Sequence, residues 1–488
     1  MVTWGISGLS HDASLAVLEG DRLLFAGHSE RYSRKKNDAL LHADLISEGL
    51  AYGRPEAIAW YERPYIKKLR HVRAGQLGNA LSLSDVPQRY LRSLLPFPLP
   101  EIFYADHHQA HAMAGVATSG FAEAVVIVAD AIGEFDTFTI SRFGRDSGLE
   151  TLYRRRYPHS LGLLYSAFTR RCGFRPNEDE YIVMGMAAFG TPIHAEQLQE
   201  EWLTIEDPGF HLRANVHRGI GEWLPGARPE DLAASIQAVT ETVLLRAASW
   251  AQRETGISNL VLMGGVALNC VANSKISTEC GFDRIWIFPN PGDAGSSVGA
   301  AAALHGGPIK WDGPYLGTDI DRPFDVDELL RTLQREGVLA LANGRAEFGP
   351  RALGNRSLLA DPRSPLMKDR VNQIKGREKF RPFAPVILAE RAAQYFDMPV
   401  PESPYMQFTA TSLFPAEFPA VVHADGTSRV QTVTSEQHPN LHALLTAWEN
   451  ATGCPMLLNT SLNSRGEPLV NTWEQAVAFG AREHVRVL

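Results

Sequence analysis

Two stretches of this chain, far apart in the sequence, share one pattern of strands. Residues 1–30 contain a short apolar strand, a turn with glycine and two further strands, and residues 124–144 repeat this arrangement. In each stretch an acid lies at a turn after the first strand, Asp12 in one and Asp130 in the other. Helical sequence separates the two, so the pattern predicts a duplicated α/β core with a cleft between its halves. Chance similarity of two hairpins is the alternative, because any α/β protein contains such units.

The length of 488 residues exceeds what one hydrophobic core usually supports, so we expect two domains. Segment 306–323 is rich in Gly, Pro and Asp, which is typical of a connection between domains. We therefore predict a first domain over residues 1–319 and a second domain over residues 320–488.

Composition excludes several classes of protein. The chain is 44% hydrophobic and 21% charged, as in ordinary globular proteins, and its net charge of -8 argues against a surface that grips nucleic acid throughout. No apolar run approaches the roughly 20 residues that span a membrane, and the N-terminus does not resemble a signal peptide. The four cysteines lack CxxC spacing. We predict a cytoplasmic protein with no membrane partner.

The sharpest short motif is Asp-His-His-Gln-Ala-His, which contains His107 and His111. Histidines at i and i+4 lie on one face of a helix, a spacing that suits one metal ion, whereas His108 points elsewhere. Asp130 ends a strand just downstream, and Asp293 lies among glycines that let the backbone approach an ion. Two histidines with two aspartates predict a site for a divalent transition metal such as iron or zinc, although helical histidine pairs also occur as ordinary structural residues.

Two further regions are candidates for binding anions. Gly264 and Gly265 follow an apolar strand and open a helix, where backbone N–H groups favour a phosphate or a nucleotide. Residues 345–381 hold ten basic side chains against four acids, interleaved with Gly, Pro and Phe, which favours an anion site over a solvated basic face. The candidate ligands of phosphate groups in the second domain are Arg351, Arg356, Lys375, Arg381, Arg429, Asn459 and Ser461.

Eight ordered motifs between residue 5 and about residue 470 resemble those of the nodulation and antibiotic O-carbamoyltransferase family. They are SHDASLAVLEG, SERYSRKKND, DHHQAHAMAG, SLGLLYSAF, MGGVALNCVAN, GRAEFGPRALGNRSLLADPR, KFRPFAP and LLNTSLNSRGEP. The resemblance implies an N-terminal domain with the duplicated fold of actin and sugar kinases, of the ribonuclease-H-like type, and a metal site. It also implies a C-terminal α/β domain similar to the threonylcarbamoyl-adenylate synthases.

The resemblance further implies a reaction. The second domain would join carbamoyl phosphate and ATP into carbamoyl-adenylate, and the first would pass the carbamoyl group to a hydroxyl of a small molecule, a sugar or a modified nucleobase. His11 and Lys36 match family residues near the acceptor and the adenylate, and a base such as His11 would help a weakly nucleophilic alcohol. Expected cofactors are Fe2+ in preference to Zn2+, and Mg2+ with ATP. The residues predicted to bind nucleotide in the first domain are Asp12, Gly133, Gly264, Gly265 and Asn269.

The chain departs from the family pattern in two places and leaves other points open. Ile182 stands where the family has a lysine, which puts one phosphate or substrate contact in doubt, and the C-terminus is short, so a final strand is missing or rearranged. The acceptor, the oligomeric state and a homodimer stay undecided, and a nucleotide acceptor is not favoured by the net charge. The basic residues of YIKKLRHVRAG could serve an anionic acceptor, but we interpret them as a solvated helix face; they are Lys67, Lys68, Arg70 and Arg73.

Two other functions were weighed against carbamoyl transfer. A sugar-kinase-like phosphotransferase is the enzymatic alternative, but kinases bind Mg2+ through carboxylates and phosphates rather than imidazoles. A non-catalytic nucleotide-gated scaffold is disfavoured by the dense polar motifs in both predicted domains.

Overall fold

The computed structural model describes residues 1–82 and 86–488, and its first sheet has the order β3-β2-β1-β4-β5. β1 pairs antiparallel with β2 and parallel with β4, so a hairpin unit is extended by two parallel strands. The strands are β1 (Val2–Ser7), β2 (Ser14–Glu19), β3 (Arg22–His28), β4 (Ala57–Trp60) and β5 (Glu101–Tyr104).

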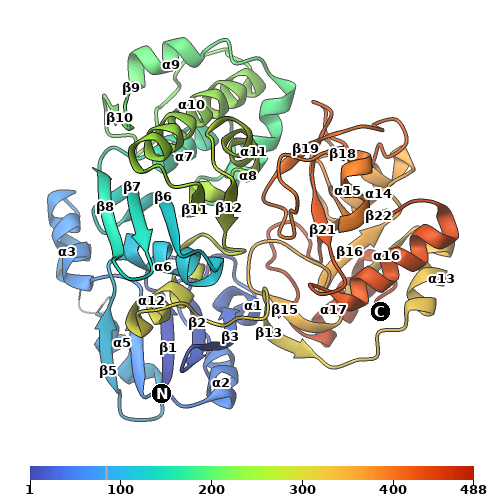
Figure 1. Cartoon of the computed structure of the whole chain (residues 1–488), viewed down its shortest axis with the longest axis horizontal. Coiled ribbons are helices and arrows are strands. Elements are labelled where there is room, and N and C mark those ends of the chain that lie inside the picture. Colours follow the sequence, from blue (N-terminus) through green and yellow to red (C-terminus); the bar gives the residue numbers. More distant parts are fainter. Residues whose placement is uncertain (83–85) are drawn as a thin grey trace.

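A second sheet has the same strand order, read as β8-β7-β6-β11-β12, with the same strand directions. Its strands are β6 (Glu123–Gly133), β7 (Asp136–Gly144), β8 (Gly148–Arg156), β11 (Asn259–Met263) and β12 (Arg284–Ile287). The predicted duplication is therefore confirmed by topology, since β1 to β3 correspond to β6 to β8 (Figure 1).

Two helices, α6 (His107–Ser119) and α12 (Ser296–His305), pack between the two sheets. α12 contacts β1 and β4 of the first sheet, whereas α6 contacts β6 and β11 of the second. The small residues of both helices form one buried cluster with valines of the second sheet. A side chain at Gly299 would meet the Ala110 carbonyl oxygen at 1.6 Å, so glycine is required for this close helix crossing.

Of the remaining helices of this region, α2 (Ala43–Tyr52) packs on β2 and β3, and α7 (Leu161–Arg171) and α10 (Pro229–Thr255) pack on β6 and β7. Near the first sheet are α1 (Ser29–Ser33), α2 (Ala43–Tyr52), α3 (Pro64–Arg73), α4 (Leu77–Leu81) and α5 (Pro87–Leu94). Near the second sheet are α7 (Leu161–Arg171), α8 (Glu180–Met186), α9 (Ala195–Trp202), α10 (Pro229–Thr255) and α11 (Cys270–Glu279), with the small hairpin β9 (Leu203–Glu206) and β10 (Gly209–Leu212).

The C-terminal part has its own sheet, of order β14-β16-β22-β17-β21, and its own core around the buried Trp448. The strands are β14 (Val338–Ala342), β16 (Arg356–Ala360), β17 (Ala384–Leu388), β21 (Gln431–Val433) and β22 (Met456–Ser461). The helices are α13 (Val326–Glu336), α14 (Pro365–Ile374), α15 (Ala389–Tyr395), α16 (Pro439–Thr452) and α17 (Trp473–Glu483). A small sheet joins β18 (Phe396–Asp397), β19 (Thr409–Ser412) and β20 (Thr427–Arg429).

The predicted boundary at residue 320 falls at the end of β13 (Tyr315–Ile320), which pairs with β15 (Gly344–Glu347). The division into 1–319 and 320–488 stays a prediction. At the C-terminus, the Ala340 N–H donates to the Arg486 carbonyl and the Leu488 N–H donates to the Ala340 carbonyl. The last residues thus add a parallel bridge beside β14.

Two predictions from composition can be compared with the structure. All four cysteines are buried and unpaired. None of the helices in residues 1–82 and 86–488 is both long and apolar enough to cross a bilayer.

Candidate metal centre and anion site

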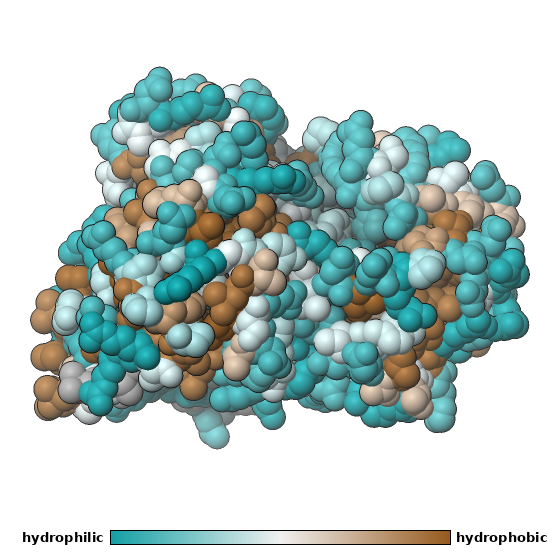
Figure 2. Space-filling view, turned by 90° about the horizontal axis from the view of Figure 1, so that it is seen from below, coloured by the Kyte–Doolittle hydropathy of each residue, from teal (hydrophilic) through white to brown (hydrophobic). Residues whose placement is uncertain are grey.

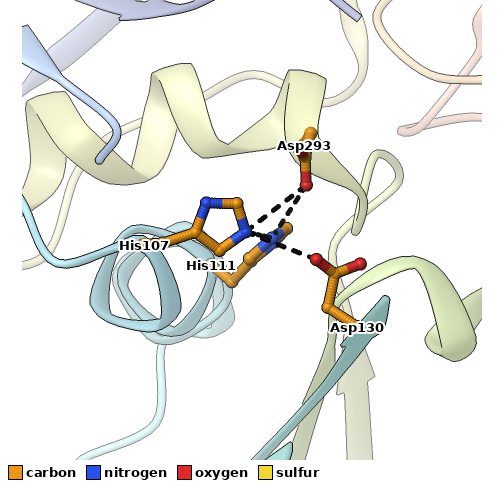
Figure 3. Close-up of side chains that lie close together, drawn as sticks. All are labelled: His107, His111, Asp130 and Asp293. Atoms are coloured by element: carbon orange, nitrogen blue, oxygen red, sulfur yellow. Dashed lines mark hydrogen bonds and ion pairs between the residues drawn. The ribbon is translucent and has the colours of Figure 1, made fainter. Parts of the chain in front are cut away.

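Four side chains from three separate elements meet between the two sheets (Figure 3). His107 and His111 lie one turn apart at the start of α6, whose N-cap is Asp106. Asp130 lies near the end of β6, and Asp293 begins the short 3-10 turn that leads into α12. One ligand atom from each of the four lies within 4.8 Å of all the others, so the structure brings the predicted metal ligands together.

The distances between these atoms suit a bound cation. His111 Nε2 lies 3.1 Å from His107 Nε2 and 3.2 Å from Asp293 Oδ1, and His107 Nε2 lies 3.4 Å from Asp130 Oδ2. Ligands that bind an ion at 2.0–2.2 Å are separated from their neighbours by roughly 3 to 3.5 Å. The Nδ1 of His111 donates to the Pro291 carbonyl, which directs its Nε2 at the cluster. The donor set therefore fits a divalent transition metal.

Charges within this group shift the pKa values of His107, Asp130 and Asp293 when no cation is present. Burial lowers the pKa of His107, but Asp293 and Asp130 outweigh it and raise this pKa to about 9. Burial alone would raise the pKa of Asp130, yet the imidazoles of His107 and His111 hold it well below its usual range. Charge within the cluster is thus balanced by protons, which a bound cation would replace.

His11 borders this cluster from the turn after β1. Its Nδ1 lies 2.9 Å from Asp12 Oδ2 and its Nε2 lies 3.5 Å from Asp293 Oδ2. The ring is 54% exposed, so it is accessible to a substrate. The partial loss of water around the ring opposes protonation, but Asp293 and Asp12 raise the pKa of His11 to about 10. Asp12 has a positive φ of 54° and orients the ring of His11, and its part in nucleotide binding stays a prediction.

The glycines predicted to bind nucleotide have structural roles around the same cluster. A side chain at Gly133 would collide with the ring of His107, and one at Gly264, where φ is +87°, would meet the Ala129 carbonyl at 2.2 Å. The Gly265 N–H lies 3.4 Å from Asp130 Oδ1 and supports that carboxylate. These glycines therefore shape the metal centre, and their part in nucleotide binding stays a prediction.

Asn269, also predicted to bind nucleotide, is the N-cap residue of α11. Its side-chain oxygen accepts from the Ala272 N–H at the start of α11, and its amide exchanges hydrogen bonds with Gln237. The residue is buried and all its polar atoms have partners. These contacts fix the side chain of Asn269 at the start of α11, and its role in nucleotide binding stays a prediction.

A cluster of arginines lies around Tyr181 of α8, where the first 320 residues meet the C-terminal part. Arg381 lies over the Tyr181 ring at 4.8 Å, and Lys36 approaches the same ring at 5.8 Å. Burial and the neighbouring Arg429 lower the pKa of Arg351 to about 9. We call the set Arg351, Arg377, Arg381 and Arg429 the arginine cluster.

The arginine cluster has few internal counter-charges. Arg381 pairs with Glu378 at 3.5 Å, whereas the other three have no ion pair among the residues that the structure describes. All four are partly exposed. Guanidinium groups gathered without matching carboxylates are typical of a site for phosphate or another oxyanion.

Arg356 lies outside this cluster, and its assignment as a phosphate ligand is wrong. The side chain is fully buried, and its guanidinium donates to the carbonyls of Thr318, Asn343, Gly344, Asn355 and Asn471. Since these carbonyls occupy its donors, Arg356 ties β16 to the surrounding loops instead of binding a ligand.

Lys375, Ser461 and Asn459 form a second buried polar group beside β22. The Lys375 ammonium is held by the carbonyls and side-chain oxygens of Ser461 and Asn463, at 2.5–3.2 Å. Asn459 donates to Ala352 and Gln431. Burial, with Arg377 next, lowers the pKa of Lys375 well below its usual range. In this conformation Lys375 is fully engaged, and its role as a phosphate ligand stays a prediction.

Sequence reasoning missed two members of the anion site. Arg377 was only one of ten basic residues in its segment, and Tyr181 was passed over for its neighbour Ile182. The structure buries Ile182 to 3% exposure, while Tyr181 contacts the cations. Tyr181 and Ile182 are adjacent on α8, and adjacent residues of a helix face different surroundings. This difference was the signal in the sequence that could have identified Tyr181.

Comparisons with known proteins identify the family. Residues 56–302 match the model of the carbamoyltransferase N-terminus, and residues 330–488 match that of the carbamoyltransferase C-terminus. The chain belongs to the carbamoyltransferase family. The expectation drawn from the eight motifs is confirmed, and the chain is a carbamoyltransferase enzyme rather than a kinase or a scaffold.

Relatives of this carbamoyltransferase include nodulation proteins. Nodulation protein NolNO of Sinorhizobium fredii is 31% identical over 96% of this chain and 76% of its own length. Nodulation protein NolO of Bradyrhizobium diazoefficiens is 34% identical over 76% of this chain and 75% of its own length. An uncharacterized protein of Synechocystis is 34% identical over 97% and 93% of the two chains.

Solved structures resemble this carbamoyltransferase only weakly. HypF in a phosphate- and nucleotide-bound form aligns with a TM-score of 0.35 and 15% identity, over 62% of this chain and 55% of that one. A ROK hexokinase from Thermus thermophilus aligns with a TM-score of 0.29 and 18% identity, over 62% and 98%. Family membership rests on the sequence matches.

Proposed function

We propose that this carbamoyltransferase forms carbamoyl-adenylate from carbamoyl phosphate and ATP, and transfers the carbamoyl group to a substrate hydroxyl. The observation that carries the proposal is the arginine cluster, four partly exposed arginines whose one ion pair among the described residues joins Arg381 to Glu378. Both co-substrates are polyanions, and such a cluster offers the charge and the paired N–H groups that phosphates need. The metal-competent group of histidines and aspartates supplies a separate place for transfer.

The first half-reaction would take place at the arginine cluster. Water hydrolyses carbamoyl phosphate to carbamate and phosphate, and a carbamate oxygen then attacks the α-phosphorus of ATP as the bond to pyrophosphate breaks. Arg351, Arg381 and Arg429 would hold the phosphate oxygens and offset the negative charge that develops on the leaving group. Lys36, which also approaches the Tyr181 ring, would add charge from the first domain.

The second half-reaction would take place beside the metal cluster. The acceptor oxygen attacks the carbamoyl carbon, its proton passes to a base and AMP leaves. A divalent metal held by His107, His111, Asp130 and Asp293 would supply positive charge to the oxygens of the adenylate. His11 is the accessible imidazole at this position, and Asp12 fixes its orientation through Nδ1.

The state of His11 depends on its acidic neighbours. With the carboxylates unopposed its pKa is about 10, so the ring is protonated near neutral pH and cannot accept a proton. A cation among the four ligands would offset those carboxylates and lower the pKa of His11 toward its ordinary range. The proposal therefore links the base function of His11 to occupation of the metal site.

The test is formation of AMP and pyrophosphate by the purified full chain, measured with and without carbamoyl phosphate. We expect AMP to form only when carbamoyl phosphate is present, and Arg351→Ala to abolish it. Arg331→Ala, at an exposed position on α13, is the matched control and should behave like wild type. Carbamoyl transfer is then sought as addition of one carbamoyl group to hydroxylated compounds by mass spectrometry.

Two results would contradict the proposal. One is wild-type chain, loaded with metal, that forms no AMP in response to carbamoyl phosphate. The other is full activity in Arg351→Ala, which would place the phosphate contacts elsewhere.

A further inference from the structure

Exposed apolar side chains are concentrated on one small part of the molecule. Among the described residues, 13 large apolar side chains are exposed, and five of them lie between residues 65 and 81. Their exposed fractions run from 50% to 80%, and the residues are Tyr65, Leu69, Val72, Leu77 and Leu81. They belong to α3 and α4, and α3 stands out from the edge of the first domain (Figure 1). Figure 2 shows apolar surface at the same edge.

A surface helix is expected to turn its apolar side chains toward the protein and its charged side chains toward solvent, and α3 does the reverse. Lys67 turns inward and bonds Ser10 Oγ at 2.5 Å and Glu62 Oε1 at 2.6 Å, whereas Tyr65, Leu69 and Val72 face outward. The sequence had suggested a solvated basic face, and the structure instead presents an apolar stripe to the surroundings. A stripe at i, i+4 and i+7 on the outside of a helix normally has a binding partner.

Cations flank this stripe on both sides. With about 100° per residue, the three apolar side chains cover roughly 60° of the helix, and Lys68 and Arg73 lie just beyond its two edges. Residues 64–84 contain four Lys and Arg and no Asp or Glu, in a chain whose net charge is -8. Among the described residues, neither Lys68 nor Arg73 forms an ion pair. The Lys68 ammonium donates a hydrogen bond to the Ser82 carbonyl.

From this geometry we infer that the α3–α4 surface docks on a lipid bilayer that contains anionic lipids. An apolar stripe bordered by cations and free of acids is the composition of helices that lie in the membrane interface. A tyrosine in the stripe suits the boundary between lipid and water. The chain would lie on the bilayer and not span it.

A second copy of this chain is a poorer occupant of the same surface. Two such stripes packed together would bring the rows containing Lys68 and Arg73 close to one another, with no acid in residues 64–84 to pair with them. Like charges at such an interface oppose association. Anionic lipid headgroups meet the same cations with opposite charge.

Docking through α3 would orient the first domain toward the membrane surface. Lys67 joins the inner side of α3 to Ser10, which immediately precedes His11. The candidate transfer site therefore lies close behind the docking surface. The inference does not depend on the proposed reaction, because it rests on the exposed surface alone.

The experiment is co-sedimentation of the full chain with vesicles of phosphatidylcholine mixed with phosphatidylglycerol, and with vesicles of phosphatidylcholine alone. We expect binding to the mixed vesicles that weakens as salt increases. Leu69→Ser with Leu77→Ser should weaken this binding by about tenfold or more, because two apolar side chains are lost from the interface. Lys68→Gln with Arg73→Gln should reduce both the affinity and its salt dependence.

The matched control is Leu366→Ser, which removes another exposed leucine, 75% exposed, on α14. It should bind vesicles like wild type, and equal melting temperatures show that all the variants are folded. The inference is overturned if wild type does not bind mixed vesicles, or if the leucine variant binds as well as wild type. Light scattering that shows a dimer lost in the leucine variant, without vesicle binding by wild type, would assign the surface to self-association instead.

Discussion

His28 gives this carbamoyltransferase a built-in sensitivity to acid that can be measured directly. The ring is 8% exposed, packs against Phe348, and lies 2.7 Å from the Asn290 amide nitrogen, which donates to its Nε2. Burial, and then the nearby Arg31 cation, lower the pKa of His28 to about 3. Asn290 precedes Pro291 and Asp293, so this hydrogen bond also steadies the loop that serves the metal cluster.

The sign and the size of the effect follow from this pKa. The unfolded chain has an ordinary histidine pKa near 6.5, so between pH 6.5 and pH 3 it binds a proton that the folded chain excludes. The contribution to stability is present above pH 6.5 and is lost progressively as the pH falls toward 3. Each pKa unit corresponds to ~1.4 kcal/mol, so the loss at pH 5 is about 2 kcal/mol and the full loss about 5 kcal/mol.

The assay is denaturant unfolding at pH 7.5 and pH 5 with a chelator present, so that metal loss does not contribute. His28→Gln keeps a hydrogen-bond acceptor but cannot be protonated, and it should lose about 2 kcal/mol less than wild type over this range. His211→Gln, at an exposed position on β10, is the control and should follow wild type. Equal losses in His28→Gln and wild type would refute the reasoning, because burial of a neutral imidazole would then not be the cause.

Three further predictions concern the two sites. His107→Ala and His111→Ala should each lose bound metal, because the oxygen ligands that remain hold a transition metal poorly, and equal metal content by elemental analysis would contradict the assignment. Arg356→Ala should lower the melting temperature by leaving buried carbonyls without donors. Arg351→Ala should leave the melting temperature nearly unchanged and remove ATP consumption. The reverse pattern would make Arg351 the structural residue and Arg356 the phosphate ligand. His11→Ala should retain AMP formation from carbamoyl phosphate and ATP while transfer to an acceptor falls by ~10²–10⁴, and a parallel fall of both activities would make His11 structural.

The sequence by itself determined the repeated core and the position of the metal-competent group. Alternation of apolar residues, turns and helical stretches predicted two similar units, because strand and helix periods are local properties of the chain. The spacing of His107 and His111 placed both rings on one helical face without any knowledge of the rest. Asp130 and Asp293 could be predicted as ligands from the sequence, because Asp130 ends a recognisable strand and Asp293 lies in a glycine turn.

Only the tertiary structure decided which basic residues can meet a ligand. Arg351 and Arg356 are five positions apart in one motif, yet the first is partly exposed in the arginine cluster and the second is enclosed by carbonyls. On α3 the periodicity separated apolar from basic residues but did not say which side faces the body, and the structure turned Lys67 inward. A helical period fixes which residues share a face, whereas the elements that pack against that face come from distant parts of the chain, so its surroundings are set only when the chain folds.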